Sequence, residues 1–294
     1  ARREHLLSKK RNEYKQMVER FFNEGTMKKT EYENSLQRQI HIDVPRTNPD
    51  VTLFQQIKIQ EALERILYVW SVRHPASGYV QGINDMVTPF MIVFLRDELY
   101  RKQKQQQQQR RRNGGGGGGE NRFSMVGSVL DLDDMSVIDD EVLQNMEADS
   151  FWCFTQFLDF IQDHYTFAQP GIQRMVHKLE EITKRIDEPL FNHIEQQGLS
   201  FIQFAFRWMN CLLMRELSLK LVIRLFDAYL AEGDNFEILH VYVCATFLKS
   251  WSEQLRRLDF TEMVIFIQHL PTQKWTFKEI ETILSQAYML KVRY

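Results

Sequence analysis

The chain has 294 residues, of which 44% are hydrophobic and 26% are charged, and its formal net charge is −2. This length allows one large domain or two small ones with a substantial core. The small net charge provides no overall basic field, so neither nucleic acid nor an anionic membrane surface is an expected partner. Three widely spaced cysteines (Cys153, Cys211 and Cys244) match neither a disulfide framework nor a zinc site, which favours a reducing, cytoplasmic setting.

The sequence shows no membrane span and no signal peptide. Its longest apolar stretch, residues 86–95, is far too short to cross a bilayer. The first residues are rich in Arg, Glu and Lys, unlike a secretory leader. Because the chain opens abruptly, we expect it to be a domain of a longer protein.

Helical periodicity dominates from one end of the chain to the other. In the clearest case, apolar residues recur every three or four positions from Phe201 to Leu217. Period-two alternation, which would indicate strands, is not convincing anywhere. The pattern predicts an all-α fold with helices at about 8–23, 59–70, 84–100, 141–163, 172–186, 201–217, 218–230, 236–252, 261–269 and 277–290.

The segment 101–138 differs in composition from the rest. It contains basic residues, a Gln run, Arg110–Arg112 and six consecutive glycines, followed by an acidic stretch with few apolar residues. Such a composition offers too little apolar surface to offset the entropy of ordering. We therefore predict a flexible low-complexity insert between two helices, and we interpret Arg110–Arg112 as solvated charge.

Two short segments carry polar residues outside any strong helical pattern. In Ile40–Arg46, Pro45 discourages helix before Arg46, which predicts that Arg46 lies in a loop or at the start of a helix. Asp43, three residues earlier, is placed to orient the Arg46 guanidinium. In the second segment Gln81 stands in a loop between Gly78 and Gly82.

Each of these residues also has an ordinary interpretation when it is taken alone. Arg46 would be a surface arginine in an ion pair, and Gln81 a solvated loop residue. Tyr79 would be a half-buried aromatic with a solvated hydroxyl. Asn84 would be a helix N-cap, with Asp85 adding favourable charge at the helix start.

An Arg and a Gln are poorly suited to acid–base or covalent chemistry, but they can stabilise and orient a phosphoryl transfer. The sequence contains no phosphate-binding glycine loop, no dinucleotide fingerprint and no metal-ligand cluster of histidines. A role in phosphoryl transfer would therefore be played in trans, on a nucleotide held by another protein.

The two segments together resemble the signature motifs of the TBC domain family of Rab GTPase-activating proteins. They read Ile40-x-x-Asp43-x-x-Arg46 and Tyr79-x-Gln81-Gly82-Ile83-Asn84-Asp85. Further similarity lies in Arg207–Glu216 and in Arg224-Leu225-Phe226-Asp227, where the family usually has Trp in place of Phe226. The sequences of residues 147–153 and 165–171 are most similar to those of the branch of the family associated with Golgi Rabs.

This resemblance implies a V-shaped fold of two helical subdomains, about 1–195 and 196–294, in which the first helix of the family domain is lacking. A GTP-bound Rab would dock in the cleft. The Rab would carry the GTP and Mg²⁺, so the chain would have no cofactor or metal of its own. Arg46 would be an arginine finger and Gln81 a glutamine finger. Asp43, Tyr79 and Asn84 would support the fingers or contact the Rab.

The chain would then be a GTPase activator in vesicle-mediated transport, not an enzyme with a nucleotide site. It would be cytoplasmic and peripheral at the Golgi or other endomembranes through its Rab, with adaptor proteins as a second partner class. The alternative is a non-catalytic TBC-like scaffold that binds Rabs or adaptors. Which Rab is the substrate stays open, because partner choice depends on surface complementarity across many helices.

Overall fold

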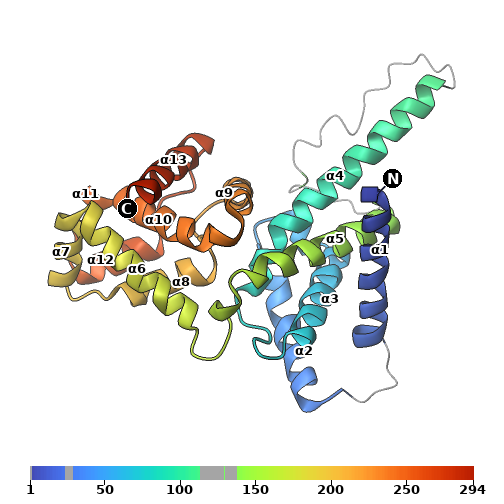
Figure 1. Cartoon of the computed structure of the whole chain (residues 1–294), viewed down its shortest axis with the longest axis horizontal. Helices are drawn as coiled ribbons and strands as arrows, with labels where there is room; N and C mark the ends of the chain where they lie inside the picture. The colour runs from blue at the N-terminus through green and yellow to red at the C-terminus, as the bar shows by residue number, and fades with distance from the viewer. Residues whose placement is uncertain (1, 24–28, 113–128, 130–137) are drawn as a thin grey trace. The chain divides into compact units, whose positions relative to one another are not determined.

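The computed structural model describes residues 2–23, 29–112, 129 and 138–294 (Figure 1). Within these ranges the chain is helical and contains no strand, so the predicted all-α class is confirmed. Its contacts divide it into two compact units, Ala1–Gln156 and Phe157–Tyr294. No helix in the described ranges is both long and apolar enough to cross a membrane.

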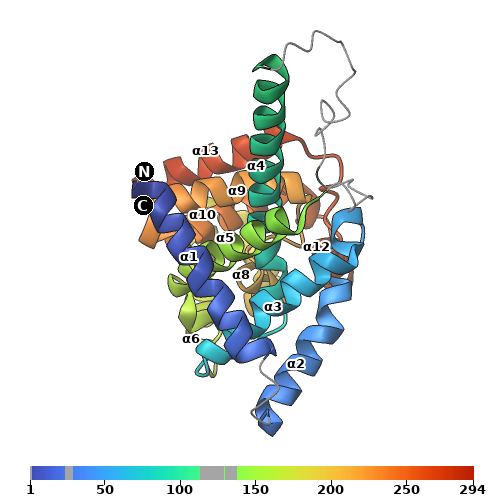
Figure 2. The ribbon, with the colours of Figure 1, turned by 90° about the vertical axis from the view of Figure 1, so that its right-hand side faces the viewer.

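The first unit contains most of the long helices of the chain. Its elements are α1 (Arg2–Val18), the π-turn η1 (Glu19–Asn23), α2 (Glu31–Asp43), the 3₁₀ turns η2 (Val44–Arg46) and η3 (Thr52–Gln55), α3 (Ile57–Arg73), α4 (Ile83–Arg112) and α5 (Asp140–Asp159). Helix α3 is central, since it contacts α1, α2 and α4 (Figures 1 and 2). Its buried residues cover nearly every side of the helix, as expected for a core element.

Charged side chains fix α3 within this unit. Arg65 of α3 donates two hydrogen bonds, of 2.9 and 2.7 Å, to the Glu147 carboxylate of α5. Arg11 of α1 donates to Asp149, also on α5, through Nε at 2.9 Å. Such bidentate pairs are among the stronger and more directional polar contacts in proteins. They tie α1 and α3 to α5.

The second unit surrounds one buried helix. Its elements, besides the end of α5, are η6 (Gln162–His164), α6 (Pro170–Ile186), α7 (Glu188–Gln196), α8 (Phe201–Asn210), α9 (Leu219–Glu232), η7 (Gly233–Asn235), α10 (Phe236–Lys249), α11 (Ser252–Leu255), α12 (Phe260–Gln268) and α13 (Phe277–Arg293). Helix α10 is buried on all sides and packs against α6, α9 and α13 (Figure 1). Phe226 of α9 stacks on Phe157, with ring centroids 4.9 Å apart. Phe226, which stands where Trp is usual in the motif noted above, therefore makes an aromatic contact.

The boundary between the units differs from the expected one. The sequence suggested a division near residue 195, whereas the contacts divide the chain after Gln156, inside α5. The physical reason is that α6 packs against α8 and α10, both of the second unit. The apolar face of α6 (Ile172, Met175, Val176, Leu179 and Ile182) is buried in those contacts.

Several helices depart from the predicted ranges. Helices α2 and α7 were not predicted; α2 runs directly into the segment that contains Pro45, and α7 has Pro189 in its first turn. Helix α8 ends at Asn210, although its apolar pattern continues to Leu217. Leu212 and Leu213 take positive φ angles of 48° and 60°, which end the helix while both side chains stay buried. The apolar pattern thus predicted the burial of Leu212 and Leu213 correctly, but it predicted their helical backbone conformation wrongly.

The predicted insert 101–138 is only partly described. Residues 101–112 continue α4 without a break, so the predicted start of the insert at residue 101, just after a helix, is wrong. Gln, Lys and Arg are good helix formers, which explains how the polar run extends an existing helix. Residues 113–128 and 130–137, including the glycine run, lie outside the described residues. Val129 and Ile138 are buried in the first unit.

Candidate functional site

Arg46 lies where α2 passes into the 3₁₀ turn η2. Helix α2 begins with a capping box between Thr30 and Glu33, and it buries Ile40 and Asp43 on one side. Pro45 then stands in the first turn of η2, a position where its missing N–H is tolerated. Arg46 follows with its side chain exposed. The sequence predicted the loop position, but it lies at the end of a helix instead of the start.

Gln81 lies in the connection between α3 and α4, residues 74–82, as predicted. Gly78 has φ 61° and Gly82 has φ 106°, and a residue with a Cβ would be strained at both positions. A Cβ at Gly78 would also lie 2.6 Å from the Tyr32 hydroxyl. Gln81 is exposed, whereas Tyr79 is buried. The two glycines therefore allow a tight turn that places Tyr79 inside and Gln81 outside.

Three side-chain hydrogen bonds join the Arg46 segment to the Gln81 loop and to the start of α4, which follows that loop. Tyr79 Oη donates to Asp43 Oδ2 at 3.0 Å. Asn84 Nδ2 donates to Thr47 Oγ1 at 2.8 Å. Asn48 Nδ2 donates to Thr88 Oγ1 at 3.1 Å. We refer to the six residues of these bonds as the loop bracket: Asp43, Thr47, Asn48, Tyr79, Asn84 and Thr88.

The loop bracket encloses both exposed side chains along the sequence. Asp43 and Thr47 stand on either side of Arg46, and Tyr79 and Asn84 stand on either side of Gln81. Five of the six bracket residues are buried, and Asn48 is half-buried. Buried hydrogen bonds are costly to break, because each group that loses its partner stays away from water. The segments that carry Arg46 and Gln81 are therefore held together as one unit.

Two of the expected contacts differ in the structure. Asp43 was expected to orient the Arg46 guanidinium, but it accepts from Tyr79, and its backbone carbonyl accepts from Thr47 Oγ1 at 3.1 Å. Asn84 was expected to cap a helix. It is instead the second residue of α4, with its Oδ1 accepting from the Gly82 N–H at 3.1 Å and its amide on Thr47. Both residues act on the loop backbone.

The charge at this site comes from Arg46. In the part of the chain that the structure describes, no carboxylate forms an ion pair with its guanidinium. A guanidinium stays positively charged and presents a planar fork of N–H donors that matches phosphate oxygens. The Gln81 carboxamide can donate one hydrogen bond and accept another. Together they can bind and orient oxygen atoms, and neither is equipped for proton transfer.

Three bracket residues have no place in the sequence motifs considered above. Thr47, Asn48 and Thr88 would read as ordinary polar residues of a loop and a helix. The only signal that could have drawn attention to them is position, since Thr47 and Asn48 directly follow Arg46. Asn48 also has φ 43°, a conformation that Asn adopts more readily than most residues.

Trp208, Arg207 and Glu216, motif residues of the second unit, lie in packing contacts and hydrogen bonds within that unit. Trp208 is completely buried in the core. Arg207 Nε donates to the buried Glu216 at 2.7 Å, and the Glu216 carbonyl accepts from Thr272. These contacts tie the end of α8 to the segments around it. In the described ranges, no group of three His, Cys, Asp or Glu side chains could hold a metal ion.

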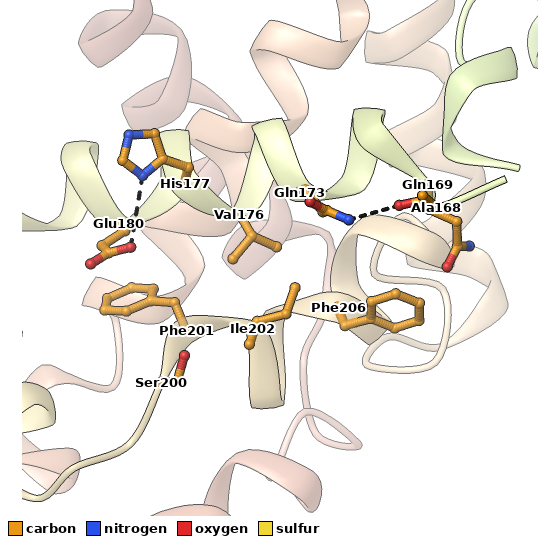
Figure 3. A pocket seen from close by; sticks show the side chains of 10 residues that line it. All are labelled: Ala168, Gln169, Gln173, Val176, His177, Glu180, Ser200, Phe201, Ile202 and Phe206. Atoms are coloured by element: carbon orange, nitrogen blue, oxygen red, sulfur yellow. Dashed lines mark hydrogen bonds and ion pairs between the residues drawn. The ribbon is translucent and has the colours of Figure 1, made fainter. Parts of the chain in front are cut away.

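A groove of about 410 Å³ lies between α6 and α8 in the second unit (Figure 3). Apolar side chains of both helices form its floor, among them Val176, Ile202 and Phe206. At its polar rim, Gln173 Nε2 donates to the Ala168 carbonyl at 2.7 Å. His177 and Glu180 form an exposed ion pair of 4.0 Å on α6 beside the groove, and none of the predicted site residues lines it. The candidate site is therefore the pair of loops in the first unit.

Comparisons with known proteins agree on one family. The family model described as the Rab-GTPase-TBC domain matches residues 4–256. The chain is 45% identical over 295 residues to the "GTPase-activating protein gyp1" of Schizosaccharomyces pombe, which covers all of this chain and 52% of that protein. It is 44% identical over 294 residues to the human "TBC1 domain family member 22B", again with 100% and 52% covered.

A solved structure gives the same result. The crystal structure of the Ypt/Rab-GAP domain of Gyp1p matches with a TM-score of 0.87 and 43% identity, covering 100% of this chain and 83% of the other. A flagellar RabGAP TBC domain from Chlamydomonas, at 17% identity and a TM-score of 0.59, shares the fold. The chain spans about half the length of the curated relatives that it matches.

Proposed function

The chain belongs to the Rab-GTPase-TBC domain family, and from this premise we propose that it accelerates GTP hydrolysis by a Rab-family small GTPase. The names of its relatives support this activity, since one is a GTPase-activating protein and the matched structure is a Ypt/Rab-GAP domain. We further propose a mechanism in which Arg46 and Gln81 are supplied in trans. The Rab carries GTP and Mg²⁺, and this chain contributes side chains alone.

Arg46 is the arginine finger in this proposal. Negative charge on the phosphate oxygens is redistributed as the γ-phosphoryl group leaves, and a fixed positive charge beside them lowers the barrier. The exposed Arg46 guanidinium suits this task, because no ion pair within the described residues competes for it. Its planar fork can contact two phosphate oxygens at once.

Gln81 is the glutamine finger. Alignment of an attacking water requires a group that accepts a hydrogen bond from the water and donates another nearby, and a carboxamide does both. Supplying this group from the activator relieves the GTPase of using its own Gln. Gln81 is exposed on a turn whose two glycines fix its direction.

The observation that carries the proposal is the loop bracket. Two exposed polar side chains of the right chemistry stand on loops that are fastened together by three hydrogen bonds between buried or half-buried groups. Catalysis by positioned charge depends on such preorganisation, because a group that must be ordered during the reaction loses much of its benefit. A scaffold that merely binds Rabs would need no such precision at these two residues.

The setting follows from the partner. We propose that the chain acts at the Golgi or other endomembranes, where it is held by the membrane-bound Rab. The proposal assigns no nucleotide or metal site to this chain, and adaptor proteins would bind elsewhere on it.

The proposal is tested by measuring GTP hydrolysis with a panel of purified Rabs. At least one Rab should hydrolyse GTP much faster with the wild-type chain, and Arg46→Ala should remove a factor of about 10³–10⁵ of that stimulation. Arg46→Lys should rescue little, because it keeps the charge and loses the fork. Arg38→Ala, an exposed arginine on α2, is the matched control. Binding of Rabs without stimulation would favour the non-catalytic scaffold.

A further inference from the structure

Two Asn–Thr pairs in the loop bracket point to positioning residues beyond the motif residues. Resting on the proposed function, we propose that Thr47, Asn48 and Thr88 hold the Arg46 loop and the Gln81 loop at one fixed spacing. They act through the backbone of the two loops and touch neither the nucleotide nor the water. The bracket makes the two fingers a single catalytic unit.

The pairs are reciprocal. The first loop supplies a hydroxyl, Thr47 Oγ1, to the amide of Asn84, at 2.8 Å. The same loop supplies an amide, Asn48 Nδ2, to the hydroxyl of Thr88, at 3.1 Å. The Arg46 loop and the first turns of α4 thus each give one donor and one acceptor to the other. The two bonds have their donors on opposite segments. Together they resist both sliding and rotation of one segment against the other, whereas a single bond would allow rotation.

Each threonine hydroxyl already donates its proton to a backbone carbonyl. Thr47 Oγ1 donates to the Asp43 carbonyl at 3.1 Å, and Thr88 Oγ1 donates to the Asp85 carbonyl at 2.7 Å. The hydroxyl oxygen is therefore oriented to accept from the asparagine of the other loop. Both threonines are completely buried, so water is not at hand as a substitute partner. The Thr47 and Thr88 side chains are therefore well suited to joining the two segments through the asparagines.

The chain path makes Thr47 and Asn48 direct neighbours of the finger. Thr47 is the residue after Arg46, and its backbone N–H donates to the Val44 carbonyl at 3.1 Å, which closes the turn that carries Arg46. Asn48 turns the chain away with φ 43°. A displacement of this turn moves the guanidinium directly. Since a shift of about 1 Å can cost 10²-fold in rate, loss of the bracket should be visible in turnover.

The first experiment compares Thr47→Val with Thr47→Ser in the full chain. Valine keeps the shape and removes the hydroxyl, whereas serine keeps the hydroxyl. We expect Thr47→Val to lower kcat of stimulated hydrolysis by about 10-fold or more, with KM for the Rab changed by less than about twofold. Thr47→Ser should restore most of the rate. A drop confined to KM, or no rescue by serine, would overturn the proposal.

The control is Thr183→Val in the second unit. Thr183 is equally buried, and its Oγ1 donates to the Leu179 carbonyl at 2.8 Å, as that of Thr47 does to Asp43. Both variants lose a buried hydroxyl and one bond to a backbone carbonyl, but only Thr47 accepts from a second loop. Thr183→Val should lower the melting temperature by less than Thr47→Val does, because it loses one bond and not two, and it should leave kcat unchanged. Equal kcat losses in the two variants would reduce Thr47 to an ordinary stabilising residue.

The second pair is tested by Asn48→Gly and Thr88→Val. Glycine tolerates the positive φ at position 48, so this change removes the side chain while the backbone path is kept. The double variant should lose no more activity than the worse single variant, because one bond is shared. Thr47→Val combined with Thr88→Val should lose more than either alone. Additive losses for Asn48→Gly and Thr88→Val would contradict the pairing.

A measurement without any Rab separates this inference from the proposed function. Hydrogen–deuterium exchange of the free chain should show that Thr47→Val accelerates amide exchange at 79–84, in the other loop, while Thr183→Val does not. This result is required whether or not the chain stimulates a Rab. Wild-type inactivity on every Rab, with the exchange coupling present, would refute the proposed function. Unchanged exchange at 79–84 would refute the coupling.

Discussion

The hydroxyl of Tyr79 donates a 3.0 Å hydrogen bond to Oδ2 of Asp43, although the two residues are 36 positions apart in the chain. Both residues are buried, whereas Arg46 and Gln81, which lie close to them in the sequence, are exposed. This bond places the polar support of the site inside the first unit and its reactive groups at the surface. It also assigns a use to Asp43 that differs from pairing with Arg46.

Tyr79→Phe should destabilise the first unit more than Asp43→Asn does. Phenylalanine leaves the buried Asp43 carboxylate without this donor, at a cost of about 1–3 kcal/mol. Asparagine can still accept from the Tyr79 hydroxyl through its carbonyl oxygen, so its cost should be smaller. Urea unfolding of both variants measures the difference. The reverse order would mean that the negative charge of Asp43 matters more than its bond to Tyr79.

Gln81→Ala should abolish most of the stimulated hydrolysis while leaving the fold intact, because the lost carboxamide is exposed. The diagnostic step repeats the assay with a Rab whose own catalytic Gln is replaced. The wild-type chain should still stimulate this Rab, since the water is aligned from the activator.

Gln39→Ala, an exposed glutamine on α2, is the matched control for that variant and should keep full activity. Complete loss of stimulation on the substituted Rab would show that the GTPase uses its own Gln and that Gln81 serves binding alone.

Affinity for the Rab should rise when the nucleotide resembles the transition state. Arg46 interacts more strongly with the redistributed charge of the reaction than with ground-state GTP. Calorimetry should therefore give a lower Kd with GDP, Mg²⁺ and aluminium or beryllium fluoride than with a non-hydrolysable GTP analogue. Arg46→Ala should remove most of this gain, and Arg38→Ala should not. Equal affinities for the two nucleotide states in the wild-type chain would favour the scaffold.

The second unit should lose stability when the pH falls below about 6.5. Burial lowers the pKa of His164 to about 4 and that of His240 to about 3. Between these values and 6.5 the unfolded chain binds protons that the folded chain excludes, so the free energy of unfolding falls as the pH falls. Each histidine contributes a slope of about 1.4 kcal/mol per pH unit in that window.

Urea midpoints measured from pH 7 to pH 5 test this dependence. His240→Gln should flatten the slope, whatever its effect on stability at pH 7. His177→Gln, at an exposed position on α6, should leave the slope unchanged. Stability that does not change between pH 7 and pH 5 would show that the two rings are protonated without cost.

The sequence by itself determined the helical class and most helix positions, and its motifs led to the two residues of the proposed mechanism. The apolar period of a helix is local, so the buried faces of α3, α6 and α13 are visible without any structure. Pro45, Gly78 and Gly82 likewise mark the loops through their own backbone preferences. These loops hold both exposed and buried side chains, since Arg46 and Gln81 are exposed and Tyr79 is buried.

The tertiary structure decided what holds the loops together. Whether the hydroxyl of Thr47 meets Asn84 or water depends on how α2 and α4 are placed within the first unit, and no local pattern encodes that placement. For the same reason Asp43 was paired with the wrong partner and Asn84 was taken as a cap. The end of α8 at Asn210 and the division after Gln156 also depend on packing between distant segments. A side chain forms hydrogen bonds with the groups that lie near it in space, and for residues far apart in the sequence only the tertiary structure brings these groups together.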